Sequence, residues 1–181
     1  MYGGESLETA ITQVVEKERP WLRFWARTFD VLIHATIIGM VWVFLHEASI
    51  ERMSSFSFNA LTTFLWIFME WGYMAIFGTT PGKKILGIRV LSSEGSAVPK
   101  YTALKRAILV WFRGMGVGVG LINLACYMIG YDNLRYAKIT SWDRDLNLKV
   151  TYKKIGIFRM LICPMIIVLF NSIALINYID L

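Results

Sequence analysis

The sequence is poor in charge, cysteine, histidine and proline. Charged residues make up 18% of its 181 positions and hydrophobic residues 56%, with two cysteines, two histidines and four prolines. A soluble domain usually has about a quarter of its residues charged. Because the apolar residues also occur in long blocks and the mean hydropathy is +0.50, the composition predicts an integral membrane protein.

The chain lacks the residue patterns of common catalytic and metal sites. Cys126 and Cys163 lie inside apolar blocks, with no C-x-x-C spacing and no histidine nearby, so both are expected to be packing residues. The stretch GTTPGKK, residues 78–84, is one residue short of a phosphate-binding loop and has no Ser or Thr after its lysine. We therefore expect no enzyme, no metal and no cofactor.

The N-terminal stretch MYGGESLETAITQVVEKER is polar and lacks the apolar core of a signal peptide. The first apolar block is therefore expected to remain in place as an anchor. The net charge of +6 is not accompanied by a nucleic-acid-binding motif. We expect no nucleic-acid partner, and we interpret the basic residues as determinants of membrane topology.

Four apolar blocks predict an all-α integral membrane fold, a small polytopic helix bundle without an internal repeat. They are Leu22–Leu45, Phe56–Phe77, Ala103–Ile129 and Ile155–Ile179. The first, second and fourth each reach the roughly 20 residues that a span needs, and a kink can accommodate Pro164. The third is interrupted by alternating glycines, which weaken a helix: Gly114, Gly116, Gly118 and Gly120. We expect three full spans plus a third segment that is re-entrant or short.

We expect a multi-pass protein of a cell membrane, plasma or inner, and the basic residues predict that its N-terminus is cytoplasmic. Lys17, Arg19 and Arg23 precede or begin the first block, whereas the loop 46–55 has a single arginine and two glutamates. Segments 78–106 and 131–154 are both basic. A re-entrant hairpin in the third block keeps both inside and leaves the C-terminus outside, whereas a single crossing would place the second basic segment outside. We favour the hairpin.

Two stretches between the blocks are typical of strands. Residues 84–98 contain a β-branched run, a turn over Ser92–Ser96 and a short second run, and residues 146–152 alternate in polarity. They predict a small cytoplasmic β element.

The first apolar block carries a stripe of polar residues. Arg23, Arg27, Asp30 and His34 are spaced by four, three and four, which places them on one narrow face of a helix. An ionised side chain near the bilayer centre costs about 2.5–3.5 kcal/mol on insertion scales, so this face must meet partners or water.

Two further ionisable residues, Glu70 in the second block and Arg113 in the third, lie at comparable depth. We hypothesise an intramembrane cluster of Arg27, Asp30, Glu70 and Arg113, with His34 deeper. The alternatives are that Arg23 and Arg27 extend to the headgroups, that His34 is a packing residue and that Glu70 forms a structural ion pair. Asp30 is too short to reach the headgroups.

Three motifs resemble the RDD family of membrane proteins: RFWARTFD, FGTTPGKKILGIRV and WDR. The resemblance covers about residues 20–152, with residues 1–20 as a cytoplasmic segment and residues 153–181 as a C-terminal extension. It maps the family arginine onto Arg23 and the two aspartates onto Asp30 and Asp143, which follows Trp142 where the family usually has histidine. The family's G-x-x-P-G-K element maps onto Gly78, Pro81, Gly82 and Lys83.

In that element Pro81 and Gly82 favour a tight turn, Pro81 by fixing φ and Gly82 by permitting positive φ. Lys83 and Lys84 are then expected at anionic headgroups.

The resemblance implies two functions. Some members are implicated in the exchange of sodium or other monovalent cations for protons, and others are accessory subunits of membrane complexes. In the first case Asp30, Glu70 and His34 are the candidate sites for Na⁺, Li⁺, K⁺ or H⁺, with Arg23, Arg27 and Arg113 as charge partners. In the second case the charges lock the helices together. Because about three spans make a small bundle, we expect a homo-oligomer or a membrane-protein partner within the lipid bilayer.

Overall fold

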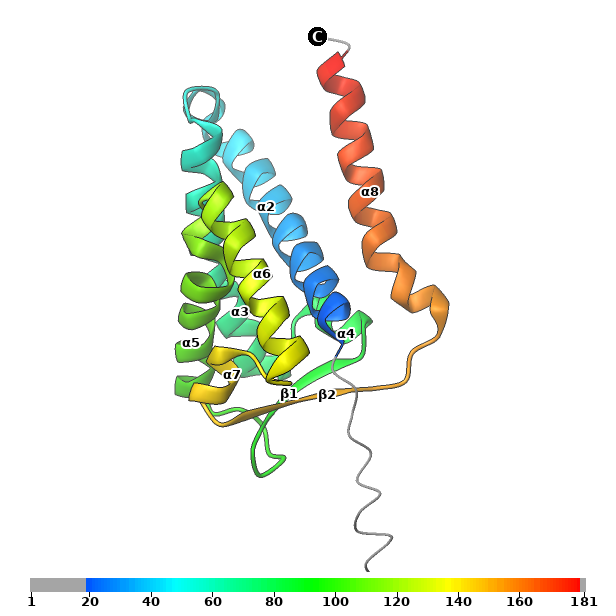
Figure 1. The fold of residues 1–181 in the computed structure, drawn as a ribbon. Coiled ribbons are helices and arrows are strands. Elements are labelled where there is room, and N and C mark those ends of the chain that lie inside the picture. Colours follow the sequence, from blue (N-terminus) through cyan, green and yellow to red (C-terminus); the bar gives the residue numbers. More distant parts are fainter. Residues whose placement is uncertain (1–18, 180–181) are drawn as a thin grey trace, which may run out of the picture.

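The structure, a computed structural model, describes residues 19–179, and of residues 46–51 and 173–179 it describes the backbone alone. Long helices run along one common direction, with a two-stranded sheet at one end (Figure 1). The elements are, in order, α2 (Pro20–Glu51), α3 (Ser55–Phe77), α4 (Pro81–Ile85), β1 (Ile88–Ser92), α5 (Lys100–Leu109), the π-helical turn η1 (Val110–Gly114), the 3₁₀ turn η2 (Gly116–Gly118), α6 (Gly120–Tyr136), α7 (Ser141–Asp145), β2 (Leu148–Tyr152) and α8 (Ile157–Ile179).

Two helices of the described chain, α2 over Pro20–Leu45 and α3 over Ser55–Phe77, are long and apolar enough to cross a membrane. Helix α3 is capped at both ends. The Ser54 side chain accepts a hydrogen bond from the backbone N–H of Ser57 at 3.1 Å, and Gly78, at φ 66°, donates to the carbonyl of Met74 at 3.1 Å. The apolar part of α8 with described side chains, Ile157–Ser172, is shorter. A third full span therefore stays a prediction.

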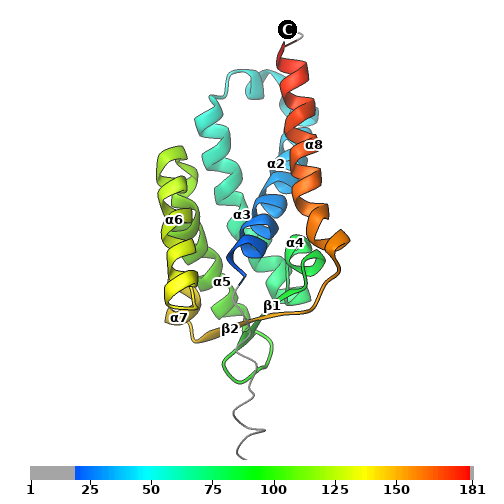
Figure 2. The same ribbon diagram turned by 45° about the vertical axis from the view of Figure 1, so that its right-hand side comes forward.

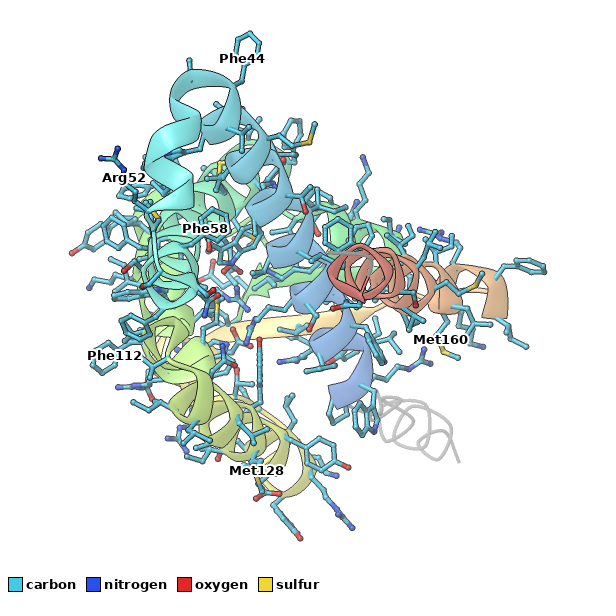
Figure 3. All side chains as sticks on the ribbon, turned by 90° about the horizontal axis from the view of Figure 1, so that it is seen from above. Phe44, Arg52, Phe58, Phe112, Met128 and Met160 are labelled. Atoms are coloured by element: carbon cyan, nitrogen blue, oxygen red, sulfur yellow. The ribbon has the colours of Figure 1, made fainter. Side chains whose placement is uncertain are left out.

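Apolar side chains cover the outside of the bundle. Viewed from above, Phe44, Phe112, Met128 and Met160 point away from the helices (Figure 3), and Phe44 is 90% exposed. Charged groups lie inside instead, since Glu70 is only 2% exposed. A helix on the surface of a soluble protein has the opposite arrangement. This inverted distribution is what a hydrocarbon solvent demands.

The third apolar block folds into a helical hairpin. Helix α5 runs along α3 away from the sheet, and α6 returns toward it, so that both ends of the block lie beside the sheet (Figures 1 and 2). The reversal contains three consecutive left-handed residues, Gly116 (φ 53°), Val117 (φ 59°) and Gly118 (φ 78°). Asn59 of α3 fixes it by donating from Nδ2 to the Gly118 carbonyl at 2.5 Å. Of the four glycines predicted to weaken the helix, Gly116 and Gly118 therefore form this turn, whereas Gly114 ends η1 and Gly120 begins α6.

The predicted small sheet is confirmed. Strands β1 and β2 pair antiparallel with Val90 opposite Val150 at the centre of the ladder. The expected turn after β1 is present, closed by a 2.9 Å hydrogen bond from Gly95 N–H to the Ser92 carbonyl. The expectation of a second short strand after this turn is wrong. Residues 97–99 form no strand and lead directly into α5.

The sheet reveals an internal repeat, although the sequence suggested none. Residues 80–92 and 140–152 each contain a threonine, a one-turn helix, a left-handed residue and a strand. Two reciprocal hydrogen bonds relate them, because Ser93 N–H donates to the Asn147 carbonyl at 3.1 Å and Lys153 N–H donates to the Gly87 carbonyl at 2.8 Å. A pseudo-two-fold axis therefore passes between Val90 and Val150. Few equivalent positions are identical, which is why the sequence pattern does not reveal the repeat.

Candidate functional site

Arg106 lies at the centre of the buried polar groups. Its side chain comes from α5 and is 3% exposed as a residue. Nη1 donates to Glu70 Oε1 at 2.9 Å, and Nε donates to Asp143 Oδ1 at 2.8 Å. One guanidinium thus joins α3, α5 and α7. Hydrogen bonds between ionised groups are the strong ones, and here they are removed from water.

Glu70 has a second cationic partner, Lys83 of α4, whose Nζ donates to the same Oε1 at 2.6 Å. Lys83 is buried, so the expectation that it lies at the headgroups is wrong, whereas Lys84 is exposed. Burial, reinforced by Arg106, lowers the pKa of Lys83 from its usual value, while Glu70 and Asp30 act in the opposite direction. The other oxygen of Glu70, Oε2, is buried and has no hydrogen-bond partner within the described part of the chain.

Asp143 accepts hydrogen bonds from three side chains. In addition to Arg106, it accepts from Arg23 Nη1 at 3.1 Å and from Thr140 Oγ1 at 2.8 Å. Burial alone would raise the pKa of Asp143, but Arg106 and Arg23 outweigh it and lower the pKa below its usual value. Arg23 and Asp143, two of the residues singled out by the sequence motifs, are therefore direct partners, and Arg23 also donates from Nε to the Tyr152 hydroxyl at 2.5 Å.

Asp30 anchors the turn that follows α3. It accepts from Thr80 Oγ1 at 2.5 Å and from the Gly82 backbone N–H at 2.6 Å, and it has no ion pair among the residues described. A Cβ atom on Gly82 would lie 2.5 Å from the Ala26 carbonyl oxygen, so only glycine permits this approach of α4 to α2. Gly82 was expected to adopt positive φ, but the left-handed glycines here are Gly78 and Gly87. Pro81 begins α4.

His34 is a satisfied buried side chain. Its Nδ1 lies 2.6 Å from the Asp30 carbonyl oxygen and its Nε2 lies 3.1 Å from the Tyr73 hydroxyl. The ring also packs against Trp66, with centroids 4.9 Å apart. This geometry fits the alternative that His34 is a packing residue, and both ring nitrogens also have a polar partner.

Two predicted members of the cluster lie elsewhere. The expectation that Arg113 belongs to the buried cluster is wrong. Its side chain is 45% exposed and pairs with Asp145 at 2.5 Å. In an uninterrupted helix Arg113 would share a face with Arg106, seven residues earlier, but Arg113 lies within the π-helical turn, whose wider winding rotates it away. Arg27 forms no ion pair with any described residue. Its guanidinium lies over the ring of Trp142, 5.2 Å from the centroid.

A cavity of about 650 Å³ opens between α2 and α6, above the sheet. Four cations line it: Arg23, Arg27, Lys83 and Arg106. One exposed carboxylate, Asp132, also lines it. Asp30, Glu70 and His34 do not. Among the residues that the structure describes, no group of His, Cys, Asp and Glu could hold a metal ion.

Sequence reasoning missed Arg106, and it missed the buried ion pair of Lys83, because in a basic loop both residues look like determinants of topology. It also missed Thr80 and Thr140, whose hydroxyls bind the two aspartates. Thr80 and Thr140 occupy equivalent positions of the repeat, and this equivalence is the one signal in the sequence that could have indicated the two threonines.

We predict that Asp143→Asn lowers the free energy of unfolding by about 3–5 kcal/mol, because it leaves Arg106 and Arg23 buried opposite a neutral group. Asp145→Asn, in the same helix but with a side chain 40% exposed, should cost far less, because water screens its ion pair with Arg113. Chemical unfolding of the two purified variants in detergent at pH 7 measures both.

Because folding lowers the pKa of Asp143, its stabilisation is complete above the unfolded value of about 3.9 and disappears as the pH falls through the folded value. Asp143→Asn should lose less stability than wild type in that acidic range. Equal costs for the two substitutions at pH 7 would contradict the arrangement.

The family model described as the RDD family matches residues 18–177, which include Arg23, Asp30, Asp143 and most of α8. No curated protein and no solved structure matches the chain. The family match agrees with the apolar helices and the apolar outer surface of the bundle, which are those of a membrane protein. The chain belongs to the RDD family.

Proposed function

We propose that this chain is a non-catalytic scaffolding subunit of a membrane complex, whose charged core fixes its helices. The observation that carries the proposal is that each core carboxylate is bound by donors from other elements. Glu70 binds α4 and α5, Asp143 binds α2 and α5, and Asp30 binds the start of α4. Breaking one partner from such a buried pair costs about 3–5 kcal/mol. The three carboxylates are therefore suited to fixing the relative positions of the helices.

The electrostatics of the cavity also favour scaffolding over cation transport. Four cations and one carboxylate line it, and Glu70 and Asp143 behind the lining pair with three of the cations. Arg27, unpaired among the residues that the structure describes, leaves an excess of positive charge, which disfavours a monovalent cation. The carboxylates that would serve an exchanger, Asp30 and Glu70, do not line the cavity.

The outer faces of α6 and α8 are available to a partner. Leu121 on α6 is 85% exposed, and Phe158 on α8 is 90% exposed. In a bilayer such faces meet lipid, a second copy of the chain or another membrane protein, and packing between helices selects among these. We therefore propose a homo-oligomer or a complex with a membrane-protein partner.

We propose that the chain lies in the plasma or inner membrane of a cell. The sheet and both basic loops then face the cytoplasm. The N-terminus is then cytoplasmic, α5 and α6 form a re-entrant hairpin, and α8 is the third span. The position of both hairpin ends beside the sheet supports this arrangement (Figure 1).

In a variant whose two native cysteines are replaced by serine, we predict that new cysteines at Ser93 and Tyr136 react with a membrane-impermeant maleimide from the same side. Both positions are exposed. Labelling of intact and inverted vesicles measures the side. Reaction from opposite sides would require the third block to cross the membrane.

Exchange of Na⁺, Li⁺ or K⁺ for protons is the second candidate, with Asp30, Glu70 and His34 as sites. One observation favours it. Asp30 holds only neutral donors and Glu70 Oε2 holds none that the described residues supply, so a proton or a cation could bind without breaking every ion pair.

Purified protein in liposomes separates the two functions. Scaffolding predicts that an imposed proton gradient survives addition of Na⁺, Li⁺ or K⁺ as it does in protein-free liposomes. It also predicts that cross-linking in the native membrane, followed by purification in mild detergent, recovers a second copy or one defined membrane polypeptide.

Cation-dependent loss of the gradient would contradict scaffolding. If Asp30→Asn or Glu70→Gln abolishes that loss while Asp145→Asn does not, exchange at the core carboxylates is the function. Recovery of uncross-linked monomer alone would also count against a scaffold.

A further inference from the structure

We infer that the cavity between α2 and α6 binds the phosphate headgroup of an anionic phospholipid, with Arg27 as its principal ligand. This inference does not depend on the scaffolding proposal, since a lipid site is compatible with either candidate function.

Arg27 differs from the other cations of the cavity. Arg23 and Arg106 bind Asp143, and Lys83 binds Glu70. Among the residues described, Arg27 forms no ion pair or hydrogen bond with a carboxylate, and Glu70 acts on it only electrostatically, from beyond ion-pair distance. Asp132 lines the same cavity but is exposed and forms no ion pair with Arg27. A guanidinium in this setting retains N–H donors for an anion, and planar guanidinium groups bind phosphate oxygens in pairs.

The Arg27 guanidinium is held in place before any ligand binds. It lies over the Trp142 ring, with Cζ 5.2 Å from the centroid, and a Cβ on Gly114 would lie 2.9 Å from its Nη1. Because glycine has no side chain, position 114 leaves the space that the Arg27 guanidinium occupies. A cation whose position is fixed loses little conformational entropy on binding, which favours affinity.

The walls of the cavity point to a lipid. Aromatic pairs join α2 to α6 along it, Trp21 with Tyr131 (5.8 Å between centroids) and Phe24 with Tyr127 (5.4 Å). Tryptophan and tyrosine are enriched where headgroups meet hydrocarbon. Basic pockets between membrane helices on the cytoplasmic side are typical sites for anionic headgroups.

The size and surroundings of the cavity agree with that assignment. A volume of about 650 Å³ is within the range of small-molecule sites and can hold a phosphoglycerol group. Met128 lines the cavity and also points out from α6 (Figure 3), where it is 62% exposed. An acyl chain leaving the cavity would lie along this apolar face. A free phosphate would bind Arg27 but would make no contact with these aromatic and apolar walls.

The test uses the full chain in uncharged detergent micelles, titrated with phosphatidylglycerol or phosphatidylcholine while the unfolding temperature is measured. We expect phosphatidylglycerol to raise it saturably and phosphatidylcholine to leave it unchanged. Arg27→Gln should weaken the apparent affinity at least about tenfold, because a charge-assisted hydrogen bond is lost. Arg27→Lys should retain part of it. Arg89→Gln is the control, since Arg89 is exposed on β1 and does not line the cavity.

A second variant tests the cavity without altering charge. Gly130 lines it, and a Cβ there would meet the Trp142 ring at an ordinary 3.6 Å, so Gly130→Leu should fold and fill the space. It should weaken phosphatidylglycerol binding as Arg27→Gln does. Equal effects of both lipids, or unchanged affinity in folded Arg27→Gln and Gly130→Leu, would overturn the inference. The same saturable shift with inorganic phosphate alone would replace the lipid by a soluble anion.

Discussion

A charge removed from water must meet an opposite charge or hydrogen-bond donors and acceptors, and this requirement organises the core of the structure. Arg106 meets it by binding Glu70 and Asp143 at once. To bring these groups together, α5 must pack along α3, and the chain must return through α6 so that α7 reaches the same place. The hairpin, its glycine turn and the sheet beneath it are thus the elements that bring this buried guanidinium and its two carboxylates together.

The internal repeat explains how a small chain supplies alternating charges. Lys83 and Asp143 occupy equivalent positions in residues 80–92 and 140–152, related by the axis at the centre of the sheet. One is a cation and the other an anion, and they bind opposite members of the Glu70–Arg106 pair. The same short unit therefore closes the core from both sides, while β1 and β2 hold the two units together.

Helical spacing was enough to predict that Asp30 and His34 would be buried on one face of α2. It was not enough to identify partners, because periodicity determines which face a residue occupies and tertiary packing determines what meets that face. Arg113 had the expected spacing, but a single π-helical turn moved it to the surface. The sequence around Lys83 is typical of lysines at a membrane surface, yet the preceding residue, Gly82, lets α4 approach α2, and the Lys83 side chain is buried.

A double-mutant cycle between Arg106 and Asp143 tests the central claim most directly. Unfolding free energies are compared for Arg106→Gln, Asp143→Asn and the double variant in the same detergent. If the two groups are partners in a buried ion pair, the double variant should cost at least about 1 kcal/mol less than the sum of the single changes. Additive costs would mean that each group is stabilised separately, and the charged core would not hold the helices together.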